Sequence, residues 1–371
     1  MNSVYIHIPF CKAKCHYCGF NSKPLEQPAE LTKYFQALAR EIAGRRTEIK
    51  SIKTIYAGGG TPTIAPARLI ETMVNALRPW APEAELTIEA NPGTVSLEKL
   101  KALREMGFNR LSLGVQSFND GLLKRIGRVH TGLQAVRAFD LGSKAGFTNI
   151  SLDLIYALPG QSMNDWGIDL EKALELGPRH ISLYSLTYER NTEFQKQKAE
   201  GRITPCGEEL EADMYLKAVE RLDRAGIERY EVSSFARKGF CSAHNANYWK
   251  AGDYLGFGAG AHSHRAGKRW SNLKNIERYV RSVNRGKDPI GFRETLSPAQ
   301  QMFEALFLGL RMTAGIDIQR FRRRFGISPL DHWPQLWLRW KEQGWVEWDA
   351  ERLHLTPEGL LLADGLALDL A

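Results

Sequence analysis

Apolar and polar positions follow two alternating rhythms along the first 235 residues. Short β-branched runs at residues 4–8, 53–57, 86–89, 110–115, 150–155, 180–185 and 229–233 predict strands. The stretches between them repeat apolar residues at helical spacing, as at Tyr34, Leu38 and Ile42. A strand-helix-strand order predicts parallel strands joined by crossover helices. The predicted fold class is therefore α/β, with a barrel, complete or partial, over residues 1–235.

Residues suited to chemistry follow these predicted strands directly. Cys11 comes after the first strand, glycines 58–60 follow the second, Glu89 ends the third and Gln116 follows the fourth. Parallel barrels build their active sites at the carboxyl ends of their strands. We therefore expect one functional mouth at that end of the sheet.

The pattern changes near residue 297. Three Ser-Pro or Thr-Pro pairs place a capping residue before a proline, which predicts helix starts at Ser297-Pro298, Ser328-Pro329 and Thr356-Pro357. Two short runs, 345–348 and 352–355, flank a turn and predict a hairpin. This order predicts a winged-helix-like α+β module over residues 297–371. A middle segment, residues 236–296, precedes it, and its part from 285 to 295 is the expected linker.

Composition places the chain among ordinary globular proteins. With 43% hydrophobic and 25% charged residues among 371, it is not a disordered, collagen-like or disulfide-scaffold sequence. The net charge of +8 favours phosphates, propionates or an acidic partner without implying nucleic acid. The longest uncharged run, residues 54–67, contains three glycines and two prolines and is too short for a spanning helix. No secretory or transit signal is recognisable, so we expect a cytoplasmic location.

Three of the five cysteines, Cys11, Cys15 and Cys18, lie within eight residues, whereas Cys206 and Cys241 are isolated and expected to be free thiols. In a reducing compartment such a cluster predicts a metal site rather than disulfides. Three thiolates are too few for a closed zinc site unless His16 or a distant residue joins them. On a cubane iron–sulfur cluster they leave one iron open to an exchangeable molecule.

The motif Cys11-x3-Cys15-x2-Cys18, followed after the second strand by Gly58-Gly59-Gly60-Thr61-Pro62, resembles the radical S-adenosylmethionine superfamily. The resemblance implies a 4Fe–4S cluster whose open iron is chelated by S-adenosylmethionine, and a partial (β/α)6 TIM-like barrel. The glycines fit this interpretation, since backbone amides can approach an aminocarboxylate closely only where no Cβ intrudes.

Further runs at residues 5–11, 88–92, 113–118 and 152–159 resemble the branch that holds the oxygen-independent coproporphyrinogen dehydrogenases and the HemW-type haem chaperones. By that similarity, ten positions contact S-adenosylmethionine: Tyr5, Tyr17, Gly59, Gly60, Thr61, Glu89, Gln116, Arg128, Asp153 and Thr187. Glu89 and Asp153, at strand ends, also suit an amino group or ribose hydroxyls, although each could be an ordinary cap or surface acid.

Two departures separate the chain from the dehydrogenases, which carry a fourth cysteine two residues after the third and a long segment before the first strand. Here position 20 is Phe20, and ten residues precede Cys11. Both departures favour the chaperone side of the branch.

The middle segment contains His244-Asn-Ala-Asn-Tyr248-Trp249, which resembles the HNxxYW haem-binding motif of HemW-type proteins. An imidazole can ligate haem iron, and a Tyr-Trp pair offers flat apolar surface to a macrocycle. We therefore expect His244, Tyr248 and Trp249 to contact haem, against the alternative of a hydrogen-bonded structural histidine. His262 and His264 are candidates for the second axial ligand, although their glycine-rich run could simply complete the fold.

An arginine cluster, Arg320 and Arg322 to Arg324, surrounds Phe321 and Phe325. It predicts a solvated helix face or a patch for an acidic partner, with DNA binding as the alternative. Five tryptophans are expected in the core of the C-terminal module: Trp333, Trp337, Trp340, Trp345 and Trp348.

The favoured function is a haem chaperone that binds haem, the cluster and S-adenosylmethionine and passes haem to an acceptor protein, for which a respiratory enzyme is one candidate. The alternatives are a coproporphyrinogen III dehydrogenase that decarboxylates its substrate to protoporphyrinogen IX, and an adaptor built on the C-terminal module; whether the chain is an enzyme stays open. A homodimer and peripheral membrane contact through the acceptor are further expected associations, and nucleic acid is not.

Overall fold

The computed structural model describes residues 1–370 and has a nine-stranded sheet at its centre, in the order β11-β1-β4-β5-β6-β7-β8-β10-β9. Its six successive parallel strands are β1 (Ser3–Ile8), β4 (Thr54–Gly59), β5 (Glu85–Ala90), β6 (Arg110–Gln116), β7 (Asn149–Tyr156) and β8 (His180–Ser185). These match the predicted strands to within one or two residues. The parallel order confirms the partial (β/α)6 barrel.

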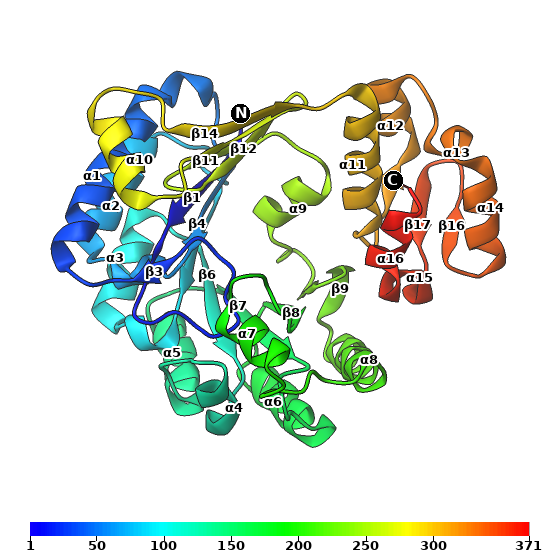
Figure 1. Cartoon of the computed structure of the whole chain (residues 1–371), viewed down its shortest axis with the longest axis horizontal. Helices are drawn as coiled ribbons and strands as arrows, with labels where there is room; N and C mark the ends of the chain where they lie inside the picture. Colours follow the sequence, from blue (N-terminus) through cyan, green and yellow to red (C-terminus); the bar gives the residue numbers. More distant parts are fainter. Residues whose placement is uncertain (371) are drawn as a thin grey trace.

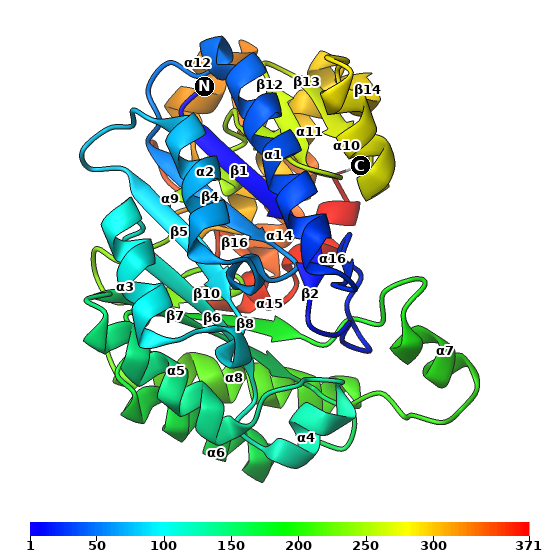
Figure 2. The ribbon, with the colours of Figure 1, turned by 90° about the vertical axis from the view of Figure 1, so that its left-hand side faces the viewer.

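Helices cover the outer face of this sheet, as Figure 2 shows. They are α1 (Pro28–Gly44), α2 (Ala67–Leu77), α3 (Leu97–Met106), α4 (Asp120–Arg125), α5 (Gly132–Lys144), α6 (Met163–Glu175) and α8 (Glu208–Arg224). The strands direct their apolar residues toward the helices, so Leu111, Leu113 and Val115 of β6 are fully buried in the core. The alternate residues of the same strand are polar or glycine and line the inside of the barrel.

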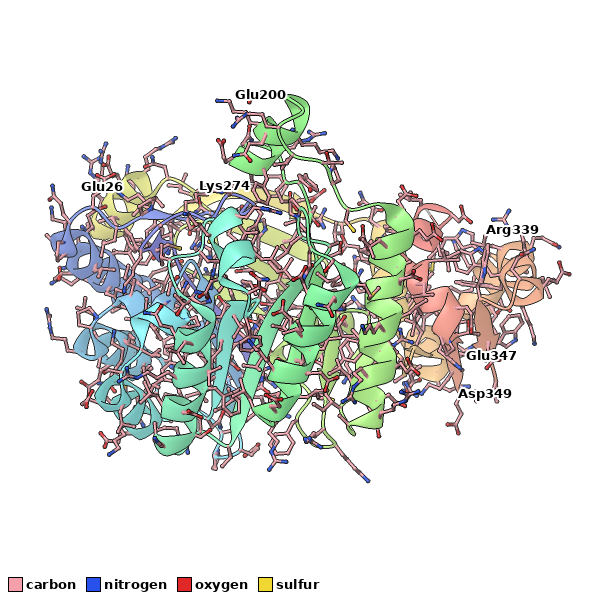
Figure 3. All side chains as sticks on the ribbon, turned by 90° about the horizontal axis from the view of Figure 1, so that it is seen from below. Glu26, Glu200, Lys274, Arg339, Glu347 and Asp349 are labelled. Carbon is pink, nitrogen blue, oxygen red and sulfur yellow. The ribbon has the colours of Figure 1, made fainter. Side chains whose placement is uncertain are left out.

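A short helix, α7 (Glu193–Ala199), projects from the rest of the molecule. Figure 3 shows Glu200, at its end, standing out beyond the barrel. The backbone N–H of Phe194 donates to the carbonyl of His16 at 2.9 Å, so this projection contacts the loop that carries the three clustered cysteines.

The predicted strand at residues 229–233 is wrong in its extent and direction. The chain instead forms β9 (Glu228–Glu231) and β10 (Ser234–Ala236), which pair antiparallel with each other, and β10 pairs antiparallel with β8. The turn between them is stabilised by the buried Glu231 carboxylate, which accepts the N–H of Ser233 at 2.9 Å. The sheet's other edge is β11 (Leu255–Phe257), parallel to β1, which the hydrophobic pattern did not predict.

The middle segment folds as α9 (Ala243–Trp249), a three-stranded sheet and α10 (Ile276–Asn284). The sheet consists of β12 (His262–Arg265), β13 (Lys268–Asn272) and β14 (Ile290–Thr295). The expected linker over 285–295 is therefore wrong in its second half, because residues 290–295 pair antiparallel with β13. Gly286 and Pro289 occupy the turn before β14, whereas Gly291 lies within the strand. Asn272 donates to the carboxylate of Glu41 on α1 at 2.7 Å, which ties this sheet to the barrel.

The C-terminal module has the predicted winged-helix-like order. Its elements are α11 (Pro298–Leu310), β15 (Ile316–Asp317), α12 (Ile318–Phe325), α13 (Pro329–His332), α14 (Pro334–Glu342), β16 (Val346–Trp348), β17 (Arg352–Leu355), α15 (Pro357–Leu361) and α16 (Ala363–Leu368). The side chains of Ser297, Ser328 and Thr356 accept backbone N–H groups at three helix starts, which confirms those predictions. Trp337 and Trp340 are fully buried in its core, with the other three tryptophans partly buried around them.

The module lies beside the barrel, with α9 between the strands and α11 (Figure 1). Arg339, Glu347 and Asp349 mark its end far from the barrel in Figure 3. Between residues 1 and 370, no helix is both long enough and apolar enough to cross a membrane.

Candidate functional site

A cavity of about 550 Å³ opens at the carboxyl ends of the parallel strands. Cys11, Cys15 and Cys18 line it together with residues from β4, β5, β6 and β7. The predicted functional mouth is therefore present, and it brings together residues that lie as far apart in the sequence as Cys11 and Thr187.

The three cysteines lie on a loop closed by two very short strands, β2 (Phe10–Cys11) and β3 (Lys23–Pro24), which pair in parallel. His16 does not turn toward the thiols. Its Nδ1 contacts the carbonyl of Arg125 at 3.0 Å, and its ring packs against Phe194. In residues 1–370 no three or more Cys, His, Asp or Glu side chains converge as they would around a single metal ion. The described structure thus offers no closed four-donor zinc site.

Two of the thiols receive hydrogen bonds from polar side chains. Thr61 Oγ1 donates to Cys11 Sγ at 3.6 Å, and Arg128 Nη1 donates to Cys15 Sγ at 3.6 Å. The pKa of the Arg128 guanidinium is raised overall. Burial alone would lower this pKa, but the interactions with Tyr17 and Cys15 outweigh the effect of burial. Burial raises the pKa of the Cys11 thiol. Donors of this kind stabilise metal-bound sulfur, so the loop fits a cluster held by three thiolates.

The glycine run has a different physical reason from the one predicted. Gly59 has φ of +110°, and a Cβ there would lie 2.6 Å from the His7 ring. A Cβ on Gly60 would lie 2.6 Å from the carbonyl oxygen of Phe10. The amides of both glycines donate within the protein, to Glu89 at 3.1 Å and to Ile8 at 2.8 Å. Close approach of the chain to itself, rather than free amides for an aminocarboxylate, therefore explains the glycines.

Glu89 and Asp153 lie at the inner wall of the cavity. Glu89 accepts the hydroxyl of Tyr56 at 2.8 Å, and burial raises its pKa to about 7. Asp153 accepts the hydroxyl of Ser112 at 3.1 Å, and burial raises its pKa as well, opposed by the charge of Arg110. Both carboxyl groups line the cavity with acceptor oxygens.

Gln116 has the unusual φ of +69° at an irregular point in the pairing of β6 with β7. A non-glycine residue in this conformation costs about 1–3 kcal/mol and is common at binding sites. The Gln116 side chain lines the cavity.

Nine of the ten residues predicted to contact S-adenosylmethionine line this one cavity: Tyr17, Gly59, Gly60, Thr61, Glu89, Gln116, Arg128, Asp153 and Thr187. Tyr5 does not. Its hydroxyl contacts His7 Nδ1 at 3.0 Å, and its ring stacks on Tyr56 with a centroid separation of 6.3 Å. Tyr5 therefore reaches the site only through Tyr56, which holds Glu89.

The polar lining residues that were not predicted include Tyr56, Arg110, Ser182, Tyr184 and Asn245. Arg110 is only 1% exposed, and its Nε has no hydrogen-bond partner within residues 1–370. The alternation of Arg110, Ser112 and Gln116 with apolar residues in one strand is the signal that could have identified this polar barrel interior.

The HNxxYW segment forms α9, and its histidine is completely buried. His244 Nδ1 contacts Thr54 Oγ1 at 2.8 Å, and Nε2 contacts Tyr248 Oη at 2.8 Å. Burial lowers the pKa of His244 to about 3, so the ring is neutral at physiological pH. The backbone N–H of His244 donates to the carboxylate of Glu85 at 3.0 Å. An iron bond would break one of the two ring contacts, so the structure does not present His244 as a free ligand.

The other expected haem residues lie apart from the cofactor cavity. His262 and His264 are on β12, where His264 Nδ1 lies 3.4 Å from an Asp253 oxygen. Tyr248 contacts Tyr254 edge-on at 4.6 Å between ring centroids. Trp249 is half-buried, and its Nε1 has no partner among residues 1–370. The haem role of these residues stays a prediction.

Three thiols on one loop at the mouth of a partial (β/α)6 barrel, sharing a cavity with half-buried carboxyl groups, define the class of radical SAM proteins. The Radical SAM superfamily model matches residues 5–173, and the HemN C-terminal domain model matches residues 296–362.

Among curated relatives, heme chaperone HemW of Bacillus subtilis is 38% identical over 98% of this chain and 97% of its own length. Heme chaperone HemW of Lactococcus lactis is 39% identical over 98% of this chain and 96% of its own length. The chain belongs to the heme chaperone HemW family. Among solved structures, the coproporphyrinogen III oxidase HemN from Escherichia coli is 24% identical in sequence. Its superposition covers 99% of this chain and 89% of the HemN chain, with a TM-score of 0.86. That likeness shows the fold.

Proposed function

We propose that this chain is a haem chaperone that holds a 4Fe–4S cluster on Cys11, Cys15 and Cys18, binds S-adenosylmethionine in the adjoining cavity, and passes haem to an acceptor protein. The observation that carries the proposal is the gathering of three thiols and two half-buried carboxyl groups around one cavity. The chain's relatives, named heme chaperone HemW, support the haem part.

Each residue of the cavity has a distinct task in this proposal. A cluster with three protein ligands supplies one open coordination position when it is bound. Thr61 and Arg128 stabilise the thiolate sulfurs by hydrogen bonds. Glu89 accepts the amino group of S-adenosylmethionine, and Asp153 accepts its ribose hydroxyls. The acceptor protein, a homodimer and membrane contact through the acceptor remain predictions.

The test of the function uses the full chain, assembled with iron and sulfide without oxygen. We expect hemin to shift the Soret band in proportion to protein, and apomyoglobin to withdraw the bound haem. A parallel incubation supplies coproporphyrinogen III, S-adenosylmethionine and a reductant, and we expect no protoporphyrinogen IX. Absence of hemin binding, or formation of protoporphyrinogen IX, would overturn the proposal.

Binding of S-adenosylmethionine is expected to weaken as the pH falls through 7. The charged Glu89 carboxylate attracts the ligand's ammonium group, and with a pKa of about 7 this carboxyl is mostly protonated at pH 6. Affinity should fall roughly tenfold per pH unit below the pKa. Equilibrium dialysis between pH 5.5 and 8 measures this, with cluster absorbance recorded at each pH.

Glu89→Gln is the matched variant for this pH dependence, because it keeps the shape and removes the titration. We expect weak binding at every pH and no slope through pH 7. The same slope in Glu89→Gln would assign the pH dependence to another group. The pKa of Glu89 is raised above its unfolded value of 4.5, so the folded state binds a proton more tightly than the unfolded state does. Glu89 therefore makes the free energy of unfolding of the wild-type chain decline as the pH rises from about 4.5 to 7. Glu89→Gln should lose that decline.

A further inference from the structure

A second pocket, of about 250 Å³, lies where the end of α9 meets the C-terminal module. Trp249 and Lys250 line it from α9, and Met312, Phe321 and Phe325 contribute apolar surface from the module. It shares no lining residue with the cofactor cavity. Two motifs that are about 70 residues apart in the sequence, the HNxxYW segment and the arginine cluster, thus meet in one place.

The pocket carries cationic side chains that form no direct ion pair among the described residues. Arg320, Arg324 and Arg352 all line it, and none of the three takes part in an ion pair within the described 370 residues. Arg324 Nη1 donates only to the carbonyl of Ala251, at 3.3 Å. Asp317 is the acidic residue in the lining, and its carboxylate accepts the backbone N–H of Arg320 at 2.7 Å as the cap of α12. This hydrogen bond and the charges of Arg352 and Arg320 lower the pKa of Asp317.

The carboxylates nearest to these arginines are already bound to other groups. Asp253 accepts the N–H of Ala266 at 2.9 Å and faces His264, and Glu304 forms an ion pair with Arg269 at 2.5 Å. Burial and the charge of Arg320 lower the pKa of Arg324, as expected of cations held close together. The site therefore has positive charge available for an external anion.

The apolar part of the pocket is aromatic. The rings of Phe321 and Phe325 pack with centroids 4.6 Å apart, and the Arg311 guanidinium lies 4.9 Å over the Trp249 ring. Flat aromatic surface beside unpaired guanidinium groups suits a flat apolar ligand that carries carboxylates at one edge. Haem has this chemistry, with two propionates on one side of the macrocycle.

We propose that this pocket docks the propionate edge of haem, with Arg320, Arg324 and Arg352 binding the propionates and Trp249 contacting the macrocycle. The inference rests on the proposed haem chaperone function. It gives Trp249, the half-buried last residue of the HNxxYW segment, a role that the buried His244 does not share. At about 250 Å³ the pocket is smaller than sites that enclose a whole ligand, so the rest of the macrocycle stays accessible to an acceptor.

The experiment compares two double variants of the full, cluster-loaded chain. Arg320→Gln with Arg352→Gln removes two pocket charges, whereas Arg322→Gln with Arg323→Gln removes two exposed charges on α12 that do not line the pocket. Hemin is titrated by Soret absorbance, and thermal melting confirms folding of each variant. We expect the pocket variant to raise the Kd for hemin at least tenfold and the control variant to change it less than twofold.

Hemin dimethyl ester, which lacks free carboxylates, is the second probe. It should bind the wild-type chain about as weakly as hemin binds the pocket variant, and it should not distinguish the two variants. Equal loss of hemin affinity in both variants, or none in either, overturns the pocket assignment while wild-type haem binding keeps the proposed function standing. Selective loss of duplex DNA or acidic peptide binding, with hemin affinity unchanged, also overturns it. Failure of the wild-type chain to bind hemin overturns the function itself.

Discussion

Cys15→Ser is expected to reduce the iron content of the anaerobically assembled protein from about four atoms per chain to below one, with loss of the iron–sulfur absorbance. Each cysteine supplies the single outer ligand of one iron, and a serine hydroxyl remains protonated where a thiol ionises. Cys15 also receives the Arg128 hydrogen bond, so the variant replaces the sulfur that accepts from this half-buried guanidinium by a smaller hydroxyl. Binding of S-adenosylmethionine should be lost with the cluster.

Cys241→Ser and Cys206→Ser are the matched controls, because neither thiol lines the cavity. Both variants should assemble the cluster as the wild-type chain does. Iron and sulfide analysis with absorbance spectra distinguishes the outcomes. One zinc per chain, bound equally well by wild type and by Cys15→Ser, would contradict the cluster and with it the assignment of the cavity to S-adenosylmethionine.

The barrel could be predicted because its strands obey a local rule. Each of the six parallel strands is a short run bounded by turns, and crossover helices dictate the direction of the next strand. The edges of the sheet follow no such rule. The segment 229–233 breaks into a hairpin because Glu231 caps a turn, and residues 290–295 form a strand because β13 offers them a partner. The local hydrophobic pattern does not predict which distant segments pair as strands.

Some residues of the candidate site could be predicted from the sequence pattern, and others depend on tertiary packing. Glu89, near the end of β5, was predictable because parallel topology gathers strand ends at one mouth, whereas Asp153 lies in the middle of β7 and lines the cavity from inside the barrel. The position of His244 was not predictable, because it depends on Thr54, a residue 190 positions earlier, and on the inward face of α9. Its motif indicates importance, but only the packing distinguishes a ligand from a buried hydrogen-bonding residue.

His244→Ala is expected to lower the free energy of unfolding by roughly 3–5 kcal/mol. The change removes a fully buried ring that lies 5.2 Å from the Tyr56 ring between centroids. It also leaves the hydroxyls of Thr54 and Tyr248 without their partner. Unfolding in guanidinium chloride, followed by far-UV circular dichroism on the full chain, measures the loss. His262→Ala, at an exposed position on β12, should change stability by less than about 0.5 kcal/mol.

Tyr248→Phe separates a structural His244 from an iron ligand. The variant keeps the ring and removes only the hydroxyl that contacts His244 Nε2, at a cost of about 1 kcal/mol. If His244 binds iron, freeing its Nε2 should strengthen hemin binding; if it is structural, hemin affinity should stay within twofold of wild type. Because His244→Ala is expected to be less stable than wild type, its hemin titration must be made under conditions where the variant is folded. A folded His244→Ala chain of wild-type stability that no longer shifts the Soret band would show that His244 is an iron ligand rather than a core residue.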